Sequence, residues 1–339
     1  MSRSLEIVGG GVAGLSLGIA LRGASIPVTV REAGSYPRHR LCGEFLNGVS
    51  EETLTGLGLS GIFAGAKTHR SMRWWLRNEL IAESLLEHPV RALSRWELDE
   101  RMRVRFEEMG GVLQSRDRVS PEPREGQVWA AGRRLVSQSK WFGLKAHYTG
   151  LTLDAGLEMH LGDGGYVGLT SVEEGRVNVC GLFEKRLGVK GKGEEILLTY
   201  LEECGLDSLV SRLRAGQVDE RSITGVAGVS FGEQGYEQSI LALGDAERMI
   251  PPFTGNGMSM AFESAECAFD PLRDYSRGKH DWEAALLEVS ARLKNRFHRR
   301  LTLAKGMHPF VLNSPGRDLL VAAAKSGLLP FSLLNRLFT

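Results

Sequence analysis

The chain has 339 residues, 42% of them hydrophobic, and its 42 Lys and Arg residues nearly balance its 41 Asp and Glu residues. This length supports a large core in one or two domains, and the balanced charge argues against a nucleic-acid-binding protein. The cysteines at 42, 180, 204 and 267 are widely spaced, so we expect neither a zinc site nor a disulfide framework, and a reducing cytoplasm is the expected compartment.

The first thirty-odd residues predict a strand–helix–strand unit. Residues 5–8 have the pattern of a short buried strand, Val12–Arg22 that of an apolar helix, and residues 27–30 that of a second strand ending at Arg31 and Glu32. Such a unit is typical of the opening of a doubly wound parallel sheet.

A glycine motif joins the first strand to the helix. Gly9-Gly10-Gly11-Val12-Ala13-Gly14 fits G-x-G-x-x-G through Gly9, Gly11 and Gly14. The first glycine allows a tight turn, the second lets the backbone approach a pyrophosphate, and the third lets the helix pack on the strand. The anion then lies at the helix N-terminus, beside Val12 and Ala13. Glu32, at the end of the second strand, can accept hydrogen bonds from a ribose diol. The motif therefore predicts a dinucleotide site without separating FAD from NAD.

The middle of the chain predicts mostly strands. Residues 71–77 and 80–86 predict a hairpin, and residues 94–109 a helix with Ser94 and Glu97 as a capping box. A buried strand is expected at residues 127–130. Short alternating segments then predict an antiparallel sheet, at residues 145–148, 158–161, 166–170 and 176–182. The Lys- and Gly-rich segment 188–193 is expected to be a solvated loop.

The last hundred residues return to α/β patterns. Residues 239–243 predict a strand ended by Gly244 and Asp245, and residues 258–268 predict a helix. The last sixty residues are expected to be helical, with an amphipathic stretch around 319–338. This stretch could dock on a membrane or pack within the molecule, and we favour packing because it has few basic residues. No membrane span is expected, since no run of about 18 apolar residues is uninterrupted.

The late segment carries a resemblance to a known family. Leu241–Ala246 is followed by Pro251-Pro252-Phe253-Thr254-Gly255-Asn256-Gly257-Met258, and here the sequence resembles the FAD enzymes of the para-hydroxybenzoate hydroxylase fold. That group includes aromatic monooxygenases, flavin halogenases and geranylgeranyl reductases. The resemblance implies that FAD is the cofactor and that Gly244 and Asp245 bind its ribityl or pyrophosphate part. It also implies that Gly255–Met258 opens a helix aimed at the flavin. Independently, a helix N-terminus can stabilise the negative charge of a reduced flavin.

Further segments agree with this resemblance. Pro37–Glu44 falls where the family has a basic residue that contacts FAD, here Arg40, and a loop that passes the flavin. Its Cys42-Gly43 pair resembles the geranylgeranyl reductase branch. Ser94–Asp99 resembles a helix start whose arginine, here Arg95, contacts the cofactor. Gly164–Leu169 resembles the reductase strand over the substrate cavity.

The sequence also departs from the family. The Asp-Gly pair expected after the strand near Val128 is replaced by Ala130–Arg133, and the halogenase pattern Trp-x-Trp-x-Ile-Pro is absent, which disfavours halogenation. Because the sequence has no second G-x-G-x-x-G, NAD(P)H is expected to bind transiently as electron donor, or a partner protein supplies the electrons.

Three residues are candidates for catalysis. Cys42 could face the flavin ring or be a small buried hydrophobe. His147 and Tyr148 lie on one strand, so alternation turns one of them toward the substrate, where His147 would be a general acid or a core histidine. Tyr166 could line the cavity or pack. Glu44 could be a buried acid, but we favour a surface carboxylate.

Together these observations predict an α/β protein with a Rossmann-like FAD-binding domain, an inserted antiparallel β-sheet substrate domain and a helical C-terminal region. The predicted boundaries are 1–66, 91–140 and 232–275 for FAD binding, 67–90 and 141–231 for substrate, and 276–339 for the C-terminal helices. The expected activity is that of an FAD-dependent monooxygenase, which hydroxylates an apolar aromatic or polyketide-like small molecule through a reduced-flavin/oxygen intermediate, as in secondary metabolism. The alternatives are a reductase of carbon–carbon double bonds, as in the geranylgeranyl reductases, and a non-catalytic flavin electron carrier. The carrier is disfavoured because it needs no substrate domain.

Overall fold

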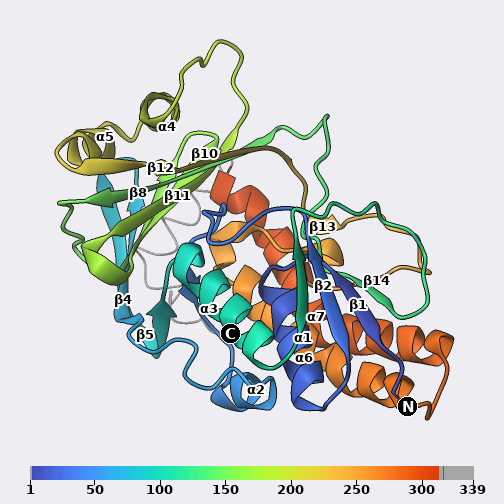
Figure 1. Ribbon diagram of the computed structural model, residues 1–339. Helices are drawn as coiled ribbons and strands as arrows, with labels where there is room; N and C mark the ends of the chain where they lie inside the picture. Colours follow the sequence, from blue (N-terminus) through green and yellow to red (C-terminus); the bar gives the residue numbers. More distant parts are fainter. Residues whose placement is uncertain (1, 313–315, 317–339) are drawn as a thin grey trace.

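The computed structural model describes residues 2–312 and 316, and in this part of the chain the strands form two large sheets and one small one (Figure 1). Sheet A is parallel, in the order β14-β7-β1-β2-β6. Its strands are β1 (Leu5–Val8), β2 (Val28–Glu32), β6 (Val112–Ser115), β7 (Gln127–Trp129) and β14 (Leu241–Ala242). In this order the chain moves outward from β1 in both directions, so a ligand crevice is expected beyond the carboxyl end of β1.

Long helices cover one face of sheet A. They are α1 (Val12–Gly23), α3 (Arg95–Glu108), α6 (Gly257–Ser276) and α7 (Trp282–Leu312). Helix α1 is buried from Val12 through Leu21, because it lies between the sheet and the helices α3 and α6. The predicted strand–helix–strand unit is therefore confirmed.

Helix α3 begins as predicted, but its capping box is half formed. Ser94 Oγ accepts a hydrogen bond from Glu97 N at 3.1 Å. The N–H of Ser94 does not bond to Glu97; it donates to Glu173 at 2.9 Å, in the short turn η1 (Glu173–Gly175). The start of α3 is thereby tied to the second sheet, which no local pattern could indicate.

Sheet B contains the predicted hairpin and alternating strands. Its order is β12-β8-β11-β10-β9-β4-β5-β3, antiparallel except for the parallel pair β4–β9. The strands are β3 (Phe45–Leu46), β4 (Lys67–Leu76), β5 (Glu79–Ala92), β8 (Trp141–Thr149), β9 (Leu157–Gly162), β10 (Gly165–Ser171), β11 (Val177–Glu184) and β12 (Gln217–Val229). The sequence did not indicate β12, which is largely polar and lies at the edge of the sheet.

The two faces of sheet B have different neighbours. The outer face, including Leu144, Ala146 and Tyr148 of β8, packs on the helices α4 (Glu194–Glu203) and α5 (Asp207–Arg214) (Figure 1). The opposite, inner face carries apolar residues such as Tyr166 and Leu182, which join the core of the sheet A layer. Lys145 and His147 alternate with the outward residues, so they belong to the inner face. As predicted, His147 and Tyr148 face opposite sides of the sheet, with His147 on the inner face and Tyr148 on the outer face.

Several predicted boundaries shift. The strand expected at 239–243 is reduced to Leu241–Ala242, and the helix expected at 258–268 runs from Gly257 to Ser276. The remaining short elements are α2 (Glu51–Gly56), η2 (Gly244–Ala246), η3 (Pro252–Thr254), and the pair β13 (Gly232–Glu233) and β15 (Arg248–Met249). The predicted amphipathic stretch at 319–338 lies outside the described residues.

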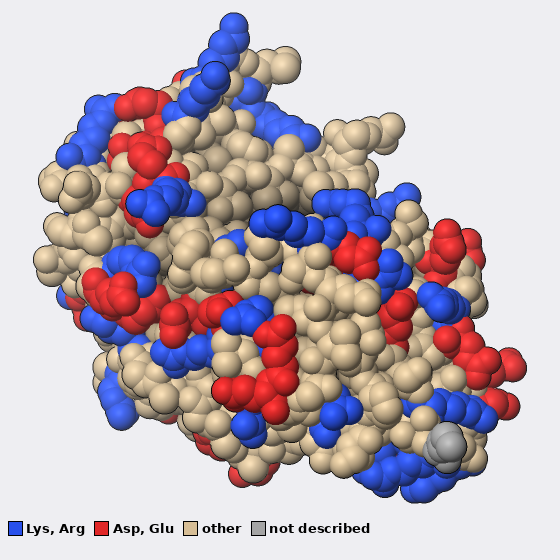
Figure 2. All heavy atoms as spheres, in the orientation of Figure 1, with Lys and Arg blue, Asp and Glu red and all other residues tan. Residues whose placement is uncertain are grey.

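The described surface carries both signs of charge. On the face shown in Figure 2, Lys and Arg side chains alternate with Asp and Glu side chains, in keeping with a net charge of +1. None of the helices within residues 2–312 has the length and apolarity to cross a bilayer.

Candidate FAD site and substrate face

The glycine motif lies at the carboxyl end of β1, where each glycine meets a different constraint. A Cβ on Gly9, whose φ is 110°, would lie 2.3 Å from the carbonyl oxygen of Ala130, and one on Gly14 would lie 2.0 Å from the carbonyl oxygen of Gly9. Within residues 2–312, nothing lies within 4 Å of such a position on Gly11. Gly9 and Gly14 therefore serve the fold, whereas Gly11 leaves space for a ligand to reach the backbone.

The N-terminus of α1 suits an anion. The first intrahelical bond runs from Leu15 N to Gly11 O at 2.9 Å, so the N–H groups of Val12, Ala13 and Gly14 precede it. Among the residues that the structure describes, no side chain caps this end, and the first turn holds no acidic residue. A diphosphate fits these donors and the positive end of the helix dipole.

Glu32 ends β2 beside the motif, with 3% of its surface exposed. Its carboxylate accepts hydrogen bonds from Gly10 N at 2.9 Å, Gly34 N at 2.7 Å and Arg38 at 2.7 Å, and Arg40 lies at 3.5 Å. Burial opposes ionisation, but Arg40, Arg38 and the two backbone donors outweigh it and lower the pKa of Glu32. A ribose diol can bond here by replacing Arg38, whose side chain is one-third exposed.

Arg40 and Arg95 meet on a buried carboxylate that the sequence reading did not assign. Asp99 has no exposed surface, and it accepts from Arg40 Nε at 2.7 Å and from Arg95 at 2.7 and 2.8 Å. Asp99 is the last residue of the segment Ser94–Asp99, whose resemblance to the family helix start pointed to Arg95, so this segment could have indicated Asp99 as well. The two predicted cofactor arginines are thus brought together and held in place by Asp99.

Gly244 and Asp245 lie in η2, directly after β14. A Cβ on Gly244, whose φ is 60°, would lie 3.0 Å from the Cβ of Ala13, so this turn lies against the start of α1. Burial raises the pKa of Asp245, and Arg133 and Arg95 act against the rise. The predicted cofactor residues of the early and late motifs are therefore neighbours.

The second helix N-terminus belongs to α6. Its first intrahelical bond runs from Met260 N to Asn256 O at 2.9 Å, so the N–H groups of Gly257 and Met258 precede it. In the described part of the chain, nothing lies within 4 Å of a Cβ added to Gly257, and Gly255 has a φ of 69°. Asn256 is buried. Gly257 thus leaves space beside these N–H groups, whereas a Cβ on Gly255 would lie 2.5 Å from the ring of Phe45, which covers the backbone there.

A buried ion cluster joins the loop at 37–45 to the inner face of sheet B. Glu44 binds Lys145 Nζ at 2.8 Å, His147 Nε2 at 2.6 Å and Arg95 N at 3.0 Å. Glu44, Lys145 and His147 have no exposed surface. The preferred reading of Glu44 as a surface carboxylate is therefore wrong, because these donors take the place of water. Burial opposes ionisation, but Lys145 and His147 lower the pKa of Glu44 to about 2.

His39 lies on the other side of this cluster. Its Nδ1 is 3.3 Å from Lys145 Nζ, and since an ammonium group has only donors, Nδ1 accepts. Its ring lies 4.7 Å from that of Trp96 and 5.1 Å from that of His147. Burial, Lys145 and His147 lower the pKa of His39 to about 4, so the imidazole is neutral near pH 7.

Cys42 lies in the same loop, tied to sheet B through its backbone. Its carbonyl oxygen accepts from Asn178 Nδ2 of β11 at 3.0 Å, and its Sγ accepts from Glu44 N at 3.4 Å. Burial raises the pKa of the thiol, with Arg95 acting against the rise. The group is therefore a neutral thiol near pH 7, not a reactive thiolate.

Tyr166 lies on the inner face, in contact with the turn η3 that precedes α6. Its hydroxyl accepts from Phe253 N at 3.2 Å, and its ring centroid lies 6.3 Å from that of Phe253 and 6.4 Å from that of His308 on α7. Burial raises the pKa of Tyr166 well above its usual range. His308 is a member of this cluster that the sequence did not indicate, since nothing in the local pattern places α7 here.

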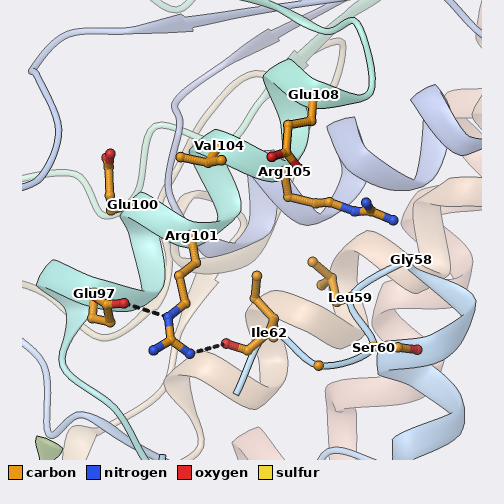
Figure 3. Close-up of a pocket in the computed structure, with 11 residues that line it drawn as sticks. Gly58, Leu59, Ser60, Ile62, Glu97, Glu100, Arg101, Val104, Arg105 and Glu108 are labelled. Carbon is orange, nitrogen blue, oxygen red and sulfur yellow. Dashed lines mark hydrogen bonds and ion pairs between the residues drawn. The ribbon is translucent and has the colours of Figure 1, made fainter. Parts of the chain in front are cut away.

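A separate surface hollow of about 550 Å³ lies between α3 and the turn after α2 (Figure 3). Arg101 crosses it and bonds to Glu97 at 2.6 Å and to the carbonyl of Ile62 at 3.1 Å. The residues that line it include none of the predicted cofactor or catalytic residues.

Comparisons with known proteins support the fold. No protein-family model matches the sequence, and no curated protein sequence does. Among solved structures, the flavin-dependent brominase Bmp2 is similar, with a TM-score of 0.73 and 18% identity over 95% of this chain and 92% of that one. HpxO of Klebsiella pneumoniae, complexed with FAD and uric acid, has a TM-score of 0.71 and 16% identity, over 95% and 93% of the chains. PqsL of Pseudomonas aeruginosa, in complex with 2-aminobenzoylacetate, has a TM-score of 0.68 and 15% identity, over 91% and 94%.

These likenesses show that the chain has the FAD-binding fold of the para-hydroxybenzoate hydroxylase type. They confirm the predicted fold class, with its parallel sheet, its largely antiparallel second sheet and its C-terminal helices.

Proposed function

We propose that this protein is an FAD-dependent monooxygenase that hydroxylates an apolar aromatic or polyketide-like small molecule. One observation carries the proposal. The N-termini of α1 and α6 are both open to a ligand, and together with the Gly244–Asp245 turn they belong to the layer of sheet A. The inner face of sheet B packs against this layer. A dinucleotide held by α1 would thus have its flavin end at α6, toward the inner face.

The residues present fit FAD. The N–H groups after Gly11 would hold the pyrophosphate and Glu32 the adenosine ribose. Arg40 and Arg95, fixed by Asp99, supply positive charge, and Asp245 would bond the ribityl chain. When bound and reduced, FAD would supply the electrons and react with oxygen. NAD(P)H, or an electron-donor protein, is the proposed source of those electrons.

The substrate would lie against the inner face. This face is apolar around Tyr166, Met159 and Leu182, and polar around Lys145 and His147. We propose Cys42, Tyr166 and His147 as the residues nearest the chemistry. HpxO and PqsL are complexed with small, planar or ring-bearing molecules, which supports a substrate of this kind.

The cofactor proposal is tested on the purified protein. It should be yellow and should release FAD on denaturation, because the Gly9–Glu32 unit is built for an adenosine diphosphate that FMN lacks. Release of FMN without FAD, or tight binding of NAD without flavin, would contradict it.

The reaction is tested with isotopically labelled oxygen and candidate aromatic substrates. A monooxygenase places one labelled atom in the product and the other in water. The alternative, reduction of a carbon–carbon double bond, is favoured by the neutral thiol of Cys42, which could donate a proton beside the ring. A reduced product formed without oxygen would establish that alternative and refute hydroxylation.

A further inference from the structure

Two neighbouring loops project from one end of sheet B (Figure 1). Residues 130–140 join β7 to β8, and residues 185–193 join β11 to α4. Because β8 and β11 are paired strands, the ends of the two loops meet, and the N–H of Lys185 donates to the carbonyl of Lys140 at 2.7 Å. These two segments, which we call the basic loops, therefore lie side by side at their bases.

Each basic loop is held at one point of its backbone and presents a leucine to solvent. Val136 N donates to the carbonyl of Gly228 at 2.9 Å, and Val189 packs on the outer core of sheet B. Beside these points, Leu135 is 60% exposed and Leu187 is fully exposed. A single exposed leucine is common on protein surfaces, but these two share one end of the molecule with a concentration of charge.

The charge in the basic loops is of one sign. Residues 133–140 contain three basic side chains and residues 185–193 contain four, and neither segment contains Asp or Glu, although the whole chain has a net charge of only +1. Two of these basic residues pair with carboxylates at the bases of the loops, but within residues 2–312 no carboxylate pairs with Lys190 or Lys192. In Figure 2, blue side chains and tan atoms project where Figure 1 places the loop between β11 and α4. Positive charge and apolar side chains therefore stand together on one exposed surface.

We propose that the basic loops bind the surface of a membrane that contains anionic lipids. In this contact the Lys and Arg side chains meet the negative headgroups, and Leu135 and Leu187 enter the boundary between headgroups and acyl chains. The contact needs no cavity, because the leucine side chains that make it are already exposed. This inference goes beyond the proposed function, since it concerns where the protein acts and not which reaction it performs.

Two other kinds of partner fit the basic loops less well. A nucleic acid would bind the basic side chains but would leave the leucines in water, and neither loop contains an aromatic side chain on which a base could stack. An acidic protein forms a stable interface over about 1,200–2,000 Å² of matched surface, whereas here the apolar side chains stand on two projecting loops. A fluid lipid surface adapts to such loops, and it offers both negative charge and apolar depth.

The test is co-sedimentation of the FAD-loaded protein with lipid vesicles. One set of vesicles contains phosphatidylcholine alone, and the other contains in addition about 30% phosphatidylglycerol, which is anionic. Each basic residue near an anionic surface raises the affinity about five-fold, so the wild type should bind the anionic vesicles at least about ten-fold more tightly than the neutral ones. At about 1 M salt, where the screening length falls to about 3 Å, most of that preference should be lost.

Variants of the second loop separate the contribution of charge from that of apolar contact. Lys190→Gln/Lys192→Gln should weaken binding to the anionic vesicles about twenty-fold and leave binding to the neutral vesicles unchanged. Leu187→Ser should weaken binding to the anionic vesicles about ten-fold, because its side chain no longer leaves water on binding. Hydrogen exchange should show that vesicles protect the backbone at residues 133–140 and 185–193.

The matched control is Leu287→Ser/Lys294→Gln on α7. Leu287 is 62% exposed and Lys294 is exposed as well, so this variant removes the same kinds of side chain from another part of the surface. It should bind both sets of vesicles as the wild type does. Thermal melting and FAD content confirm that each variant is folded.

The outcomes separate a membrane surface from the other partners and from the proposed function. A wild type that binds neither set of vesicles overturns the inference, and so do loop variants that bind as well as the wild type. Binding to poly-glutamate that is as tight as binding to vesicles and insensitive to Leu187→Ser would indicate an acidic protein partner and would likewise overturn it. Because the assay measures no turnover, none of these results bears on hydroxylation.

Discussion

Replacing Glu32 with Gln tests the cofactor site most directly, because the change keeps the side-chain shape. The carboxylate accepts from Gly10 N, Gly34 N and Arg38 within 2.9 Å, and every one of its partners is a donor. In the amide, one oxygen becomes an NH2 group that faces donors. At least one charge-assisted bond is lost, which is worth about 1.5–3 kcal/mol. Since about 1.4 kcal/mol is a factor of ten, FAD affinity should fall about ten- to a hundred-fold.

The assay is titration of the apoprotein with FAD, followed by flavin fluorescence, with thermal melting to confirm folding. Glu6→Gln is the control on the adjacent strand. Glu6 is partly exposed, and its pairs with Arg31 and Arg124 are long, at 3.7 and 3.6 Å. Such surface pairs contribute less than about 1 kcal/mol. A folded Glu32→Gln variant with wild-type affinity would refute the assignment of Glu32 to the ribose.

Four further outcomes are expected. Asp245→Ala should lower FAD affinity about ten- to a hundred-fold in the same titration, and an unchanged dissociation constant would mean that Asp245 does not touch the cofactor. Cys42→Ala should keep its FAD and hydroxylate nearly as fast as the wild type, because a neutral thiol does not act as a base. A large loss of turnover in this variant would favour the reductase. Glu44 has a folded-state pKa of about 2 against an ordinary 4.5, so its contribution to stability is complete above pH 4.5 and is lost as pH falls toward 2. In Glu44→Gln, the free energy of unfolding measured with urea should therefore depend less on pH in that window. Burial lowers the pKa of His308 to about 4 from 6.5, so the free energy of unfolding should fall as pH drops from 6.5 to 4. His308→Phe should remove that fall. An unaltered pH profile in this variant would show that His308 is not buried as described.

Local patterns were sufficient to predict the first part of the candidate cofactor site. The roles of Gly9, Gly11 and Gly14 follow from consecutive residues, since a tight turn and a helix start are decided within a few positions. Strand alternation likewise predicted that His147 and Tyr148 face opposite sides of the sheet. The late motif, Gly244–Met258, could be assigned to the cofactor only through the family resemblance, because its predicted role depends on its position beside α1.

The sequence by itself determined the parallel sheet with its glycine motif, the second, largely antiparallel sheet and the residues that are candidates for facing a dinucleotide. The tertiary structure decided which charged groups meet. Glu44 lies 101 positions from Lys145 and 103 from His147, and no local rule tells a loop glutamate bound for the interior from one left in water. A buried charge is stable only when distant donors converge on it. Those donors come from a strand and a helix that the fold, not the neighbouring sequence, brings to the loop.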